Sequence, residues 1–333
     1  MVFYKTPADM RQRSLVWFLA MEEFIAGEGE GFFIWQVPST VIFGRNQVME
    51  AEVNVAFCKQ HGINLFRRKS GGGCVYADMG NIMISYFCGG SRGAAFMFDR
   101  YLQRLTLALK SLGLDASRSG RNDVLVAGRK VSGNALFKTP SAAIVHGTLL
   151  YDTDFDMMQE AITPSSAKIE SKGISSVRQR VTNLKTELEA IGRPLSQEDL
   201  KSYLINFLKG PDGVEVELSD ADMEEISRIE ASYLDPGFIA GRNHTYSLSF
   251  SGRTRAGELC VSLDMDGNFI KACHLDGDFF VLEDSDIDAA LTSVLKGCTL
   301  ERPALKQAFA GTKLEELILN LDTSEFINLI TNN

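Results

Sequence analysis

Apolar residues recur at helical spacing through much of the chain, and the clearest case is the segment 97–112. Its apolar positions follow the pattern of a helix with one buried face: Phe98, Tyr101, Leu102, Leu105, Leu109 and Leu112. The same spacing predicts helices over residues 14–25, 48–61, 196–208, 220–233, 285–295, 303–309 and 323–330. Ser14 and Ser196 stand at N-cap positions, and Asp199 follows Ser196 at the spacing of a capping box.

Shorter segments rich in β-branched and aromatic residues predict strands over residues 32–37, 40–43, 64–69, 82–87, 123–126, 131–137 and 142–151. We expect strands 64–69 and 82–87 to be neighbours, joined through a glycine-rich turn. A tight turn at residues 127–130 makes a hairpin of the two strands that flank it. Because the strands precede and flank few helices, the pattern predicts an α+β fold with a mixed or antiparallel sheet.

The segment 236–245 is predicted to be a linker. After it, Leu259, Val261 and Leu263 alternate with polar residues, and Asp266-Gly267 is a type I′ turn signal, which together predict a second hairpin. The tail is long enough to bury a small core of its own. We therefore predict two domains, a larger one over residues 1–240 and a smaller α+β one over residues 247–333.

Composition narrows the class of protein. The 333 residues are 45% hydrophobic and 23% charged, as in ordinary globular proteins, and the net charge of −9 argues against general nucleic-acid binding. Six scattered cysteines form no C-x-x-C pair, so neither a zinc site nor a disulfide framework is predicted. The apolar run 15–21 is too short to span a membrane and lacks a signal-peptide cleavage pattern. We expect a cytoplasmic protein with no nucleic-acid or membrane partner.

Residues 67–81 form the most informative run, in which two arginines and a lysine lead into Ser70 and three glycines. Glycines let the backbone approach a ligand closely, and successive N–H groups in such a turn can bind an anion. Neighbouring arginines would add charge-assisted hydrogen bonds to phosphate. A basic surface hairpin with a glycine turn has the same composition, so this run alone leaves both interpretations open.

Residues 121–135 form a second basic run, with Asn122, Asp123, Lys130 and Gly133. The Asn-Asp pair could read a base edge or hold Mg²⁺, which prefers oxygen ligands. Lys130 could reach a phosphate or a carboxylate from its short hairpin. Such residues also occur on solvated surfaces, but cationic clusters in an acidic chain suggest a local anionic ligand.

Both runs, with residues 145–150 and 172–184, resemble the lipoate–protein ligase A family of the biotin/lipoate protein ligase superfamily. That family has R-R-x-S-G-G-G, then N-D, K-V-S-G-x-A, H-H-G-T-L-L and K-G-I-x-S-V-R in this order. The agreement extends from about residue 14 to 184. The tail, with residues 277–280, resembles the family's accessory domain.

The resemblance implies a catalytic domain of the biotin/lipoate ligase type, with a mixed or antiparallel sheet, and a small accessory domain. Family members adenylate lipoate with ATP and Mg²⁺. They then transfer the lipoyl group to a lysine on apo lipoyl domains, in the E2 subunits of 2-oxoacid dehydrogenases and in the glycine cleavage H protein.

The resemblance also implies roles for single residues. Lys130 would be catalytic, contacting the acyl carbonyl and the α-phosphate, and Asp123 would face the nucleotide and its Mg²⁺. The remaining residues implied to bind lipoate or ATP are Arg68, Ser70, Gly71, Gly72, Gly73, Val75, Tyr76, Asn81, Asn122, Ser132, Gly133, His146 and Thr148.

The chain departs from the family pattern at three positions. Ala77 and Val145 replace histidines, which we interpret as supporting positions, and Cys74 replaces an alanine. Cys74 is either a small buried hydrophobe or an oxidisable thiolate.

Two other functions stay open. An ATP-independent octanoyl or lipoyl transferase would need a nucleophilic cysteine near the lysine hairpin, and residues 89–259 contain none. A non-catalytic lipoate-binding protein would not need Lys130, Asn122 and Asp123. The sequence does not rank lipoate against octanoate.

Overall fold

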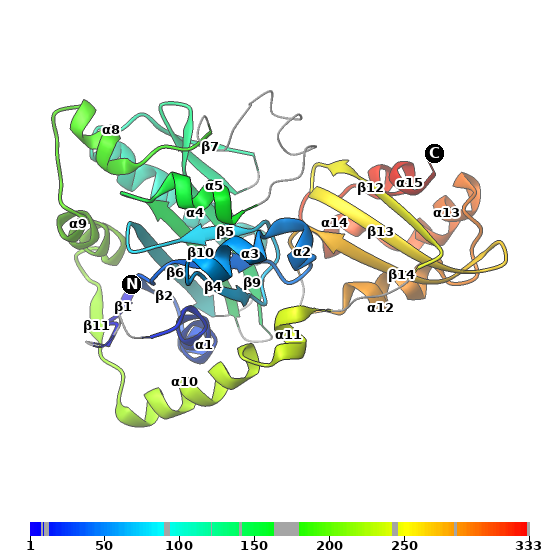
Figure 1. The fold of residues 1–333 in the computed structure, drawn as a ribbon, viewed down its shortest axis with the longest axis horizontal. Coiled ribbons are helices and arrows are strands. Elements are labelled where there is room, and N and C mark those ends of the chain that lie inside the picture. The colour runs from blue at the N-terminus through cyan, green and yellow to red at the C-terminus, as the bar shows by residue number, and fades with distance from the viewer. Residues whose placement is uncertain are drawn as a thin grey trace.

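The computed structural model describes residues 1–7, 9, 13–89, 94–120, 122–139, 142–162, 180–241, 246–282 and 285–331. A large mixed sheet forms the centre of the chain up to residue 241 (Figure 1). Its strands, in spatial order, are β11 (Val214–Val216), β1 (Val2–Tyr4), β2 (Gly31–Trp35), β6 (Asn81–Gly89), β10 (Ala142–Leu150), β9 (Arg129–Lys138), β8 (Asp123–Val126) and β7 (Ala116–Ser119). Strand β1 is parallel to both of its neighbours, and the other pairs are antiparallel. The predicted α+β fold is confirmed.

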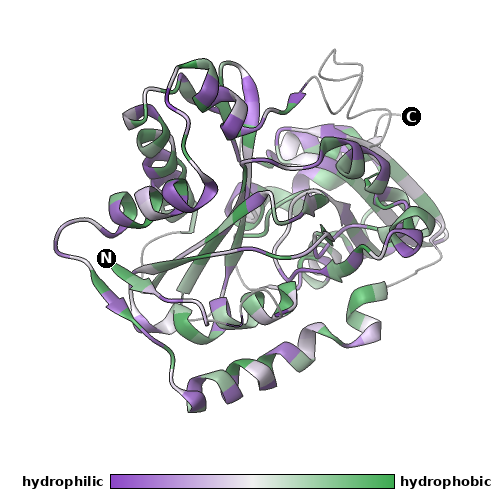
Figure 2. Cartoon of the chain, turned by 60° about the vertical axis from the view of Figure 1, so that its left-hand side comes forward, coloured by the Kyte–Doolittle hydropathy of each residue, from purple (hydrophilic) through white to green (hydrophobic). Residues whose placement is uncertain are grey.

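Helices cover both faces of this sheet. On one face lie α4 (Ala94–Ser111), α8 (Leu184–Ala190) and α9 (Gln197–Lys209). On the other lie α1 (Leu15–Ile25) and α10 (Asp220–Tyr233). The strands at the centre of the molecule are accordingly rich in hydrophobic residues, shown in green in Figure 2.

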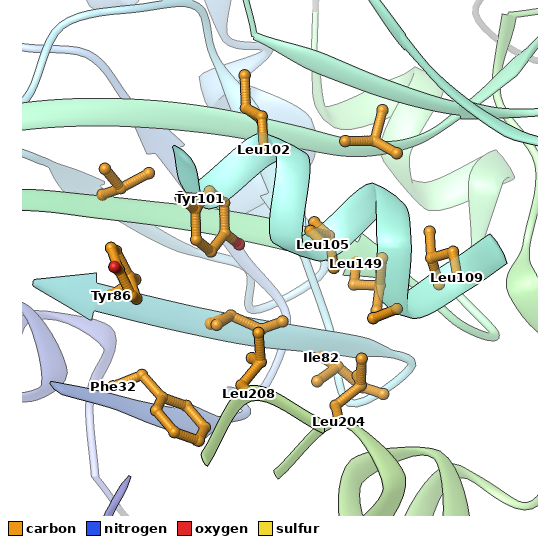
Figure 3. Close-up of a cluster of buried hydrophobic side chains, with 14 of the residues drawn as sticks. Phe32, Ile82, Tyr86, Tyr101, Leu102, Leu105, Leu109, Leu149, Leu204 and Leu208 are labelled. Carbon is orange, nitrogen blue, oxygen red and sulfur yellow. The ribbon is translucent and has the colours of Figure 1, made fainter. Parts of the chain in front are cut away.

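Strand β6 shows how one strand serves both cores. Ile82 and Ile84 belong to the cluster under α4, whereas Met83 and Phe87 belong to the cluster under α1, as the period of two requires. Figure 3 shows the first cluster, in which leucines of α4 lie over Ile82 and over Leu149 of β10. The two faces of the strand thus fix the helices on opposite sides of the sheet.

Serine caps start several helices. The Ser14 hydroxyl accepts the Trp17 N–H at the start of α1, and the Ser196 hydroxyl accepts the Asp199 N–H at the start of α9. A reciprocal capping box occurs at α10, between Ser219 and Asp222. The predicted N-caps at Ser14 and Ser196 are confirmed.

The prediction that strands 64–69 and 82–87 are neighbours was wrong. Strand β4 (Asn64–Arg67) lies in a separate small sheet, parallel to β3 (Thr40–Phe43), and β3 also pairs with β5 (Val75–Ala77). The glycine run returns the chain to β5 rather than directly to β6. Periodicity predicts a strand but not its partner, because pairing depends on residues distant in the sequence.

Two other segments differ from expectation. Residues 48–61 form two short helices, α2 (Met49–Glu52) and α3 (Val55–Gln60), because Asn54 caps the second and interrupts the first. The predicted linker begins with a helix, α11 (Pro236–Ala240), which Asp235 caps. Residues 242–245 of that linker lie outside the described residues.

The C-terminal region, described over residues 246–282 and 285–331, forms a three-stranded antiparallel sheet with its own hydrophobic cluster. Its strands are β12 (Leu248–Thr254), β13 (Gly257–Asp266) and β14 (Phe269–Gly277), so the predicted hairpin is confirmed. Four helices follow: α12 (Ile287–Leu295), α13 (Arg302–Ala308), α14 (Leu314–Leu317) and α15 (Thr323–Thr331). The boundary between residues 240 and 247 stays a prediction. No helix among the described residues has the length and apolar character needed to cross a membrane.

We predict that Leu105→Ala lowers the free energy of unfolding by about 2–5 kcal/mol, because Leu105 is buried between α4 and the sheet. The matched control is Leu107→Ala on the same helix, where the side chain is 48% exposed and the change should stay within about 0.5 kcal/mol. Urea denaturation followed by circular dichroism measures both. Equal losses in the two variants would contradict the assigned face of α4.

Candidate functional site

A cavity of about 430 Å³ lies between the large sheet, the small sheet and the C-terminal region. This volume is in the range of natural small-ligand sites. Apolar side chains on its wall include Leu15, Leu19, Trp35, Ile42, Val75 and Met83. Polar and charged side chains on its wall include Asn122, Asp123, Lys130, Asn134, His146, Thr148, Arg180, Arg253 and Asp278. The cavity therefore suits a ligand with one apolar part and one anionic part.

Arg68 shapes the glycine loop from inside. Its guanidinium donates to the carbonyl oxygens of Gly71 at 2.7 Å, Gly73 at 2.8 Å and Ile42 at 3.2 Å. Burial lowers the pKa of Arg68 to about 10, so the group stays protonated at neutral pH. A buried guanidinium must satisfy its donors, and here main-chain carbonyls of the loop satisfy them.

The other two cations of this run also have internal partners. Arg67 donates to main-chain oxygens of two segments: Gly44, Arg45, Gln47, Ile239 and Ala240. Lys69 forms an ion pair with Glu23 at 2.9 Å and lies over the Tyr233 ring. The predicted supply of free cations beside the glycine loop is therefore not what the structure shows, because hydrogen bonds or an ion pair within the protein engage each of them.

The glycine loop also holds the C-terminal region. The Gly72 N–H donates to the Phe279 carbonyl oxygen at 2.9 Å, and Gly72 has a positive φ of +87°, which favours glycine. A Cβ at Gly71 would lie 1.9 Å from the same Phe279 oxygen, so no larger residue fits there. The Phe280 ring packs on Phe98 of α4 at 5.8 Å between centroids. The loop is thus both a wall of the cavity and a contact with the second region.

The hairpin of β8 and β9 presents Lys130 and Asp123 to the cavity. Their Nζ and Oδ1 atoms lie 2.8 Å apart, and the side chains are 29% and 16% exposed. A Cβ at Gly133 would lie 2.8 Å from the Lys130 Nζ, so the glycine makes room for the lysine side chain. The result is a confined ammonium group on the wall of the cavity.

Amide side chains brace this hairpin. Asn122 Nδ2 donates to the Asn134 carbonyl at 2.8 Å, and Asn134 Nδ2 donates to the Asn122 carbonyl at 2.9 Å. The Ser132 hydroxyl donates to the Asn134 side-chain oxygen. Asn122 thus lines the cavity while its amide donor supports the hairpin. Ser132 does not line the cavity and supports it through Asn134.

A buried polar network connects α1, the glycine loop and β10. The two ring nitrogens of His146 contact Ser70 Oγ at 2.7 Å and Glu22 Oε2 at 2.8 Å. Ser85 donates to the other Glu22 oxygen and accepts from the Trp35 indole N–H at 2.8 Å. All five side chains are buried. His146 is therefore a hydrogen-bonded core histidine that also lines the cavity, and its orientation is fixed.

Most of the residues implied to bind ligand line this one cavity. They are Arg68, Gly72, Gly73, Val75, Tyr76, Asn122, Asp123, Lys130, Gly133, His146 and Thr148. Ser70, Gly71, Asn81 and Ser132 do not line it. Asn81 braces a turn by accepting from the Thr153 hydroxyl at 2.8 Å.

The departures from the family pattern are accommodated by packing. Ala77 and Val145 are fully buried among apolar side chains, where an imidazole would need polar partners. Cys74 lies on the cavity wall. Arg121 and residues 172–179, which carry the K-G-I-x-S-V-R motif, lie outside the described residues.

Sequence reasoning missed several residues of the site. Glu22 directly follows the apolar run 15–21, and a carboxylate among the buried residues of a helix is itself a signal of a buried partner. Arg180 also lines the cavity. Arg253 and Asp278 come from the C-terminal region, and no local pattern could place them here. Within the described residues, no three His, Cys, Asp or Glu side chains cluster as a metal site.

Comparison with known proteins gives consistent matches along the chain. Residues 19–209 match the family of the lipoyl protein ligase A/B catalytic domain, and residues 243–330 match the bacterial lipoate protein ligase C-terminus. Lipoate-protein ligase LplJ of Bacillus subtilis is 32% identical over 94% of this chain and 95% of its own length. Lipoate–protein ligase 1 of Staphylococcus aureus is 33% identical over the same shares of the two chains.

Solved structures share the fold. P. falciparum LipL1 in complex with lipoate superimposes with a TM-score of 0.76 at 17% identity, covering 99% of this chain and 98% of that one. Lipoate-protein ligase A bound with ATP gives 0.60 at 23% identity, covering 72% and 98%. A bipartite ligase with its E2 lipoyl domain from Thermoplasma acidophilum gives 0.61 at 24%, covering 74% and 98%.

We predict that Gly71→Ala destabilises the protein by about 1–3 kcal/mol, because the added Cβ would displace Phe279 from the glycine loop. The matched control is Gly73→Ala, whose Cβ would meet its nearest atom at 3.8 Å, so we expect a change within about 1 kcal/mol. Thermal unfolding by calorimetry compares them. A tolerated Gly71→Ala would show that this contact is dispensable.

Proposed function

This chain belongs to the lipoyl protein ligase A/B family, and we propose that it is an ATP-dependent lipoate–protein ligase. In the first step, the lipoate carboxylate attacks the α-phosphorus of ATP, and the bond to the bridging oxygen breaks to release pyrophosphate. In the second step, a neutral lysine amine of the acceptor attacks the acyl carbonyl. An amide forms, and AMP and a proton leave.

The observation that carries this proposal is the Lys130–Asp123 pair in a cavity that also has an apolar wall. The first step brings an anionic carboxylate toward a polyphosphate. A preorganised ammonium group lowers its barrier by stabilising the negative charge that develops on the phosphate. In the second step the same group would stabilise the charge on the acyl carbonyl oxygen. Gly133 keeps the space that the Lys130 side chain needs.

The apolar wall suits the acyl chain. Leu15, Leu19, Trp35, Ile42 and Met83 are buried residues of one hydrophobic cluster. Each buried methylene contributes about 0.8 kcal/mol, so a four-carbon tail and a dithiolane ring gain affinity from such a wall without specific polar contacts. An octanoyl chain is similarly apolar. We propose lipoate as the substrate because the named relatives are lipoate ligases.

The buried network holds this wall in place. Glu22 fixes His146, and His146 holds Ser70 at the base of the glycine loop. The loop and the acyl wall therefore keep one relative position. We infer that the network positions the substrate rather than transferring a proton, since Ser70 and Glu22 engage both ring nitrogens of His146.

ATP and Mg²⁺ are the proposed cofactors. The structure of lipoate-protein ligase A bound with ATP supports the nucleotide. Asp123 places a carboxylate on the cavity wall beside Lys130, and Mg²⁺ commonly uses one or two carboxylates together with phosphate oxygens, so the residues fit this ion. A bound Mg²⁺ would neutralise phosphate charge beside Lys130.

The proposed acceptors are apo lipoyl domains of 2-oxoacid dehydrogenase E2 subunits and of the glycine cleavage H protein. The archaeal ligase solved with its E2 lipoyl domain supports the first class. The six cysteines form no disulfide, which suits a reducing compartment, and we place the reaction in the cytoplasm.

One observation favours a second candidate, an ATP-independent acyl transferase. Cys74 lies on the wall of the same cavity as Lys130, which sequence reasoning did not anticipate. Such an enzyme would pass the acyl group through a thioester on this sulfur. Cys74→Ser would then abolish transfer, whereas a ligase should keep its ATP-dependent activity.

The proposal is tested by mass spectrometry of an apo lipoyl domain incubated with the protein, lipoate, ATP and Mg²⁺. We expect a lipoyl mass shift that disappears when ATP is omitted or when EDTA removes the metal. A shift that needs no ATP, with octanoyl carrier protein or a lipoylated protein as donor, would favour the transferase instead.

We predict that Lys130→Ala reduces lipoyl-AMP formation by about 10²–10³-fold, the usual cost of removing one charge-stabilising donor. Lys185→Ala is the matched control, because Lys185 forms a surface pair with Asp152 at the same 2.8 Å distance. Pyrophosphate release in the presence of lipoate measures both. Full activity in a folded Lys130→Ala variant would refute the role assigned to Lys130.

A further inference from the structure

Lys130 shares a face of strand β9 with a residue that regular strand geometry would place on the other face. Lys130 and Gly133 both line the cavity, and a Cβ at Gly133 would lie 2.8 Å from the Lys130 Nζ atom. In a regular strand successive side chains point to opposite faces, so residues three positions apart lie on different faces. The backbone between these two residues therefore departs from regular strand geometry.

A β-bulge supplies this departure. Strand β9 pairs with β8 through Ser132 and through Lys130, but Val131 between them has no partner in β8. A bulge of this kind re-aims the side chains that follow it. With regular pairing, Lys130 would lie opposite Val126, whose side chain is buried in the cluster under α4. The bulge therefore moves Lys130 from the α4 face of the sheet to the cavity face, and Val131 anchors it in that same cluster.

The bulged end of the hairpin is also held from outside. Lys130 forms a parallel bridge with Val181, and the Thr182 N–H donates to the Lys130 carbonyl oxygen at 3.0 Å. Glu187 of α8 connects this segment to the hairpin, because its Oε1 atom accepts from the Thr182 hydroxyl at 2.6 Å and from the Arg129 guanidinium. One carboxylate thus binds the residue before Lys130 and the residue that is hydrogen-bonded to its main chain.

This carboxylate is buried but is not part of the cavity wall. The Glu187 side chain is 10% exposed, and neither Glu187 nor Arg129 nor Thr182 lines the cavity. Its side-chain partners lie on β9 and on the segment bound to Lys130 rather than on its own helix. Any effect of Glu187 on a ligand must therefore pass through the main chain of Lys130.

We propose that Glu187 is a positioning residue for the ligase reaction: it holds the bulged end of the hairpin, so that the ammonium group of Lys130 stays aimed into the cavity. This inference rests on the proposed function. A cation that stabilises developing charge must be in place before the reaction begins. A displacement of about 1 Å can cost as much as 10²-fold in rate, so a loosened hairpin would slow adenylation while Lys130 is still present.

The test compares Glu187→Ala with the wild-type protein, and repeats the change in the Lys130→Ala background. Glu189→Ala is the matched control, since Glu189 is exposed on the same helix and its loss changes the net charge equally. Arg129→Gln is a second variant, which breaks the same contact from its more exposed end.

Two quantities are measured in every variant: the rate of lipoate-dependent pyrophosphate release at saturating ATP, and the KM for lipoate. Thermal unfolding establishes that each variant is folded at the assay temperature. In Glu187→Ala we expect the rate to fall about tenfold while the KM for lipoate stays within about twofold, because the acyl wall is not touched. Arg129→Gln should lower the rate in the same direction, and Glu189→Ala should resemble wild type.

The double variant separates positioning from a purely structural role. If Glu187 acts through Lys130, Glu187→Ala should cause no further loss of rate in the Lys130→Ala background, because both changes remove the same interaction. An equal fold loss with and without Lys130 would overturn the proposal, and so would a wild-type rate in a folded Glu187→Ala variant. Where Glu187→Ala does not fold, the same two outcomes in Arg129→Gln decide. A wild-type protein without ATP-dependent activity would instead refute the proposed ligase function.

Discussion

The site depends on one constraint: the N–H donors of two buried guanidinium groups must all find hydrogen-bond acceptors within the protein. Arg67 and Arg68 are buried, so their donors take main-chain carbonyl oxygens from several segments. Arg68 closes the glycine loop on itself, and Arg67 connects the small sheet to α11. Because the loop has one conformation, it can form a cavity wall on one side and bind the Phe279 carbonyl on the other.

Polar groups inside the larger core have a similar effect on the acyl wall. Glu22 lies on a helix whose other buried residues are apolar, and its two oxygens are satisfied by His146 and Ser85. Trp35 adds its indole N–H to Ser85 while its ring lines the cavity. A fully satisfied network of this kind is rigid, because breaking any member leaves a buried polar group without a partner. The apolar wall is therefore held by hydrogen bonds behind it as well as by packing.

The cations near the site differ in what they contact. Arg67, Arg68 and Lys69, adjacent in sequence, all bind the protein itself. Lys130 and Arg253, far apart in sequence, lie on the cavity wall. A conspicuous basic run is thus a structural device in this chain, and the cationic part of the site is assembled from separate elements.

The sequence by itself determined the local elements and part of the site. Leucine spacing predicted α4, and turn residues predicted the hairpins of β8–β9 and β13–β14, the first of which carries Lys130 and Asp123. These features depend on residues within a few positions of one another. Only the tertiary structure decided that β4 pairs with β3, that the arginines of the glycine run turn inward, and that Arg253 reaches the cavity. Each of these depends on which distant segments pack together, and hydrophobic periodicity does not determine that packing.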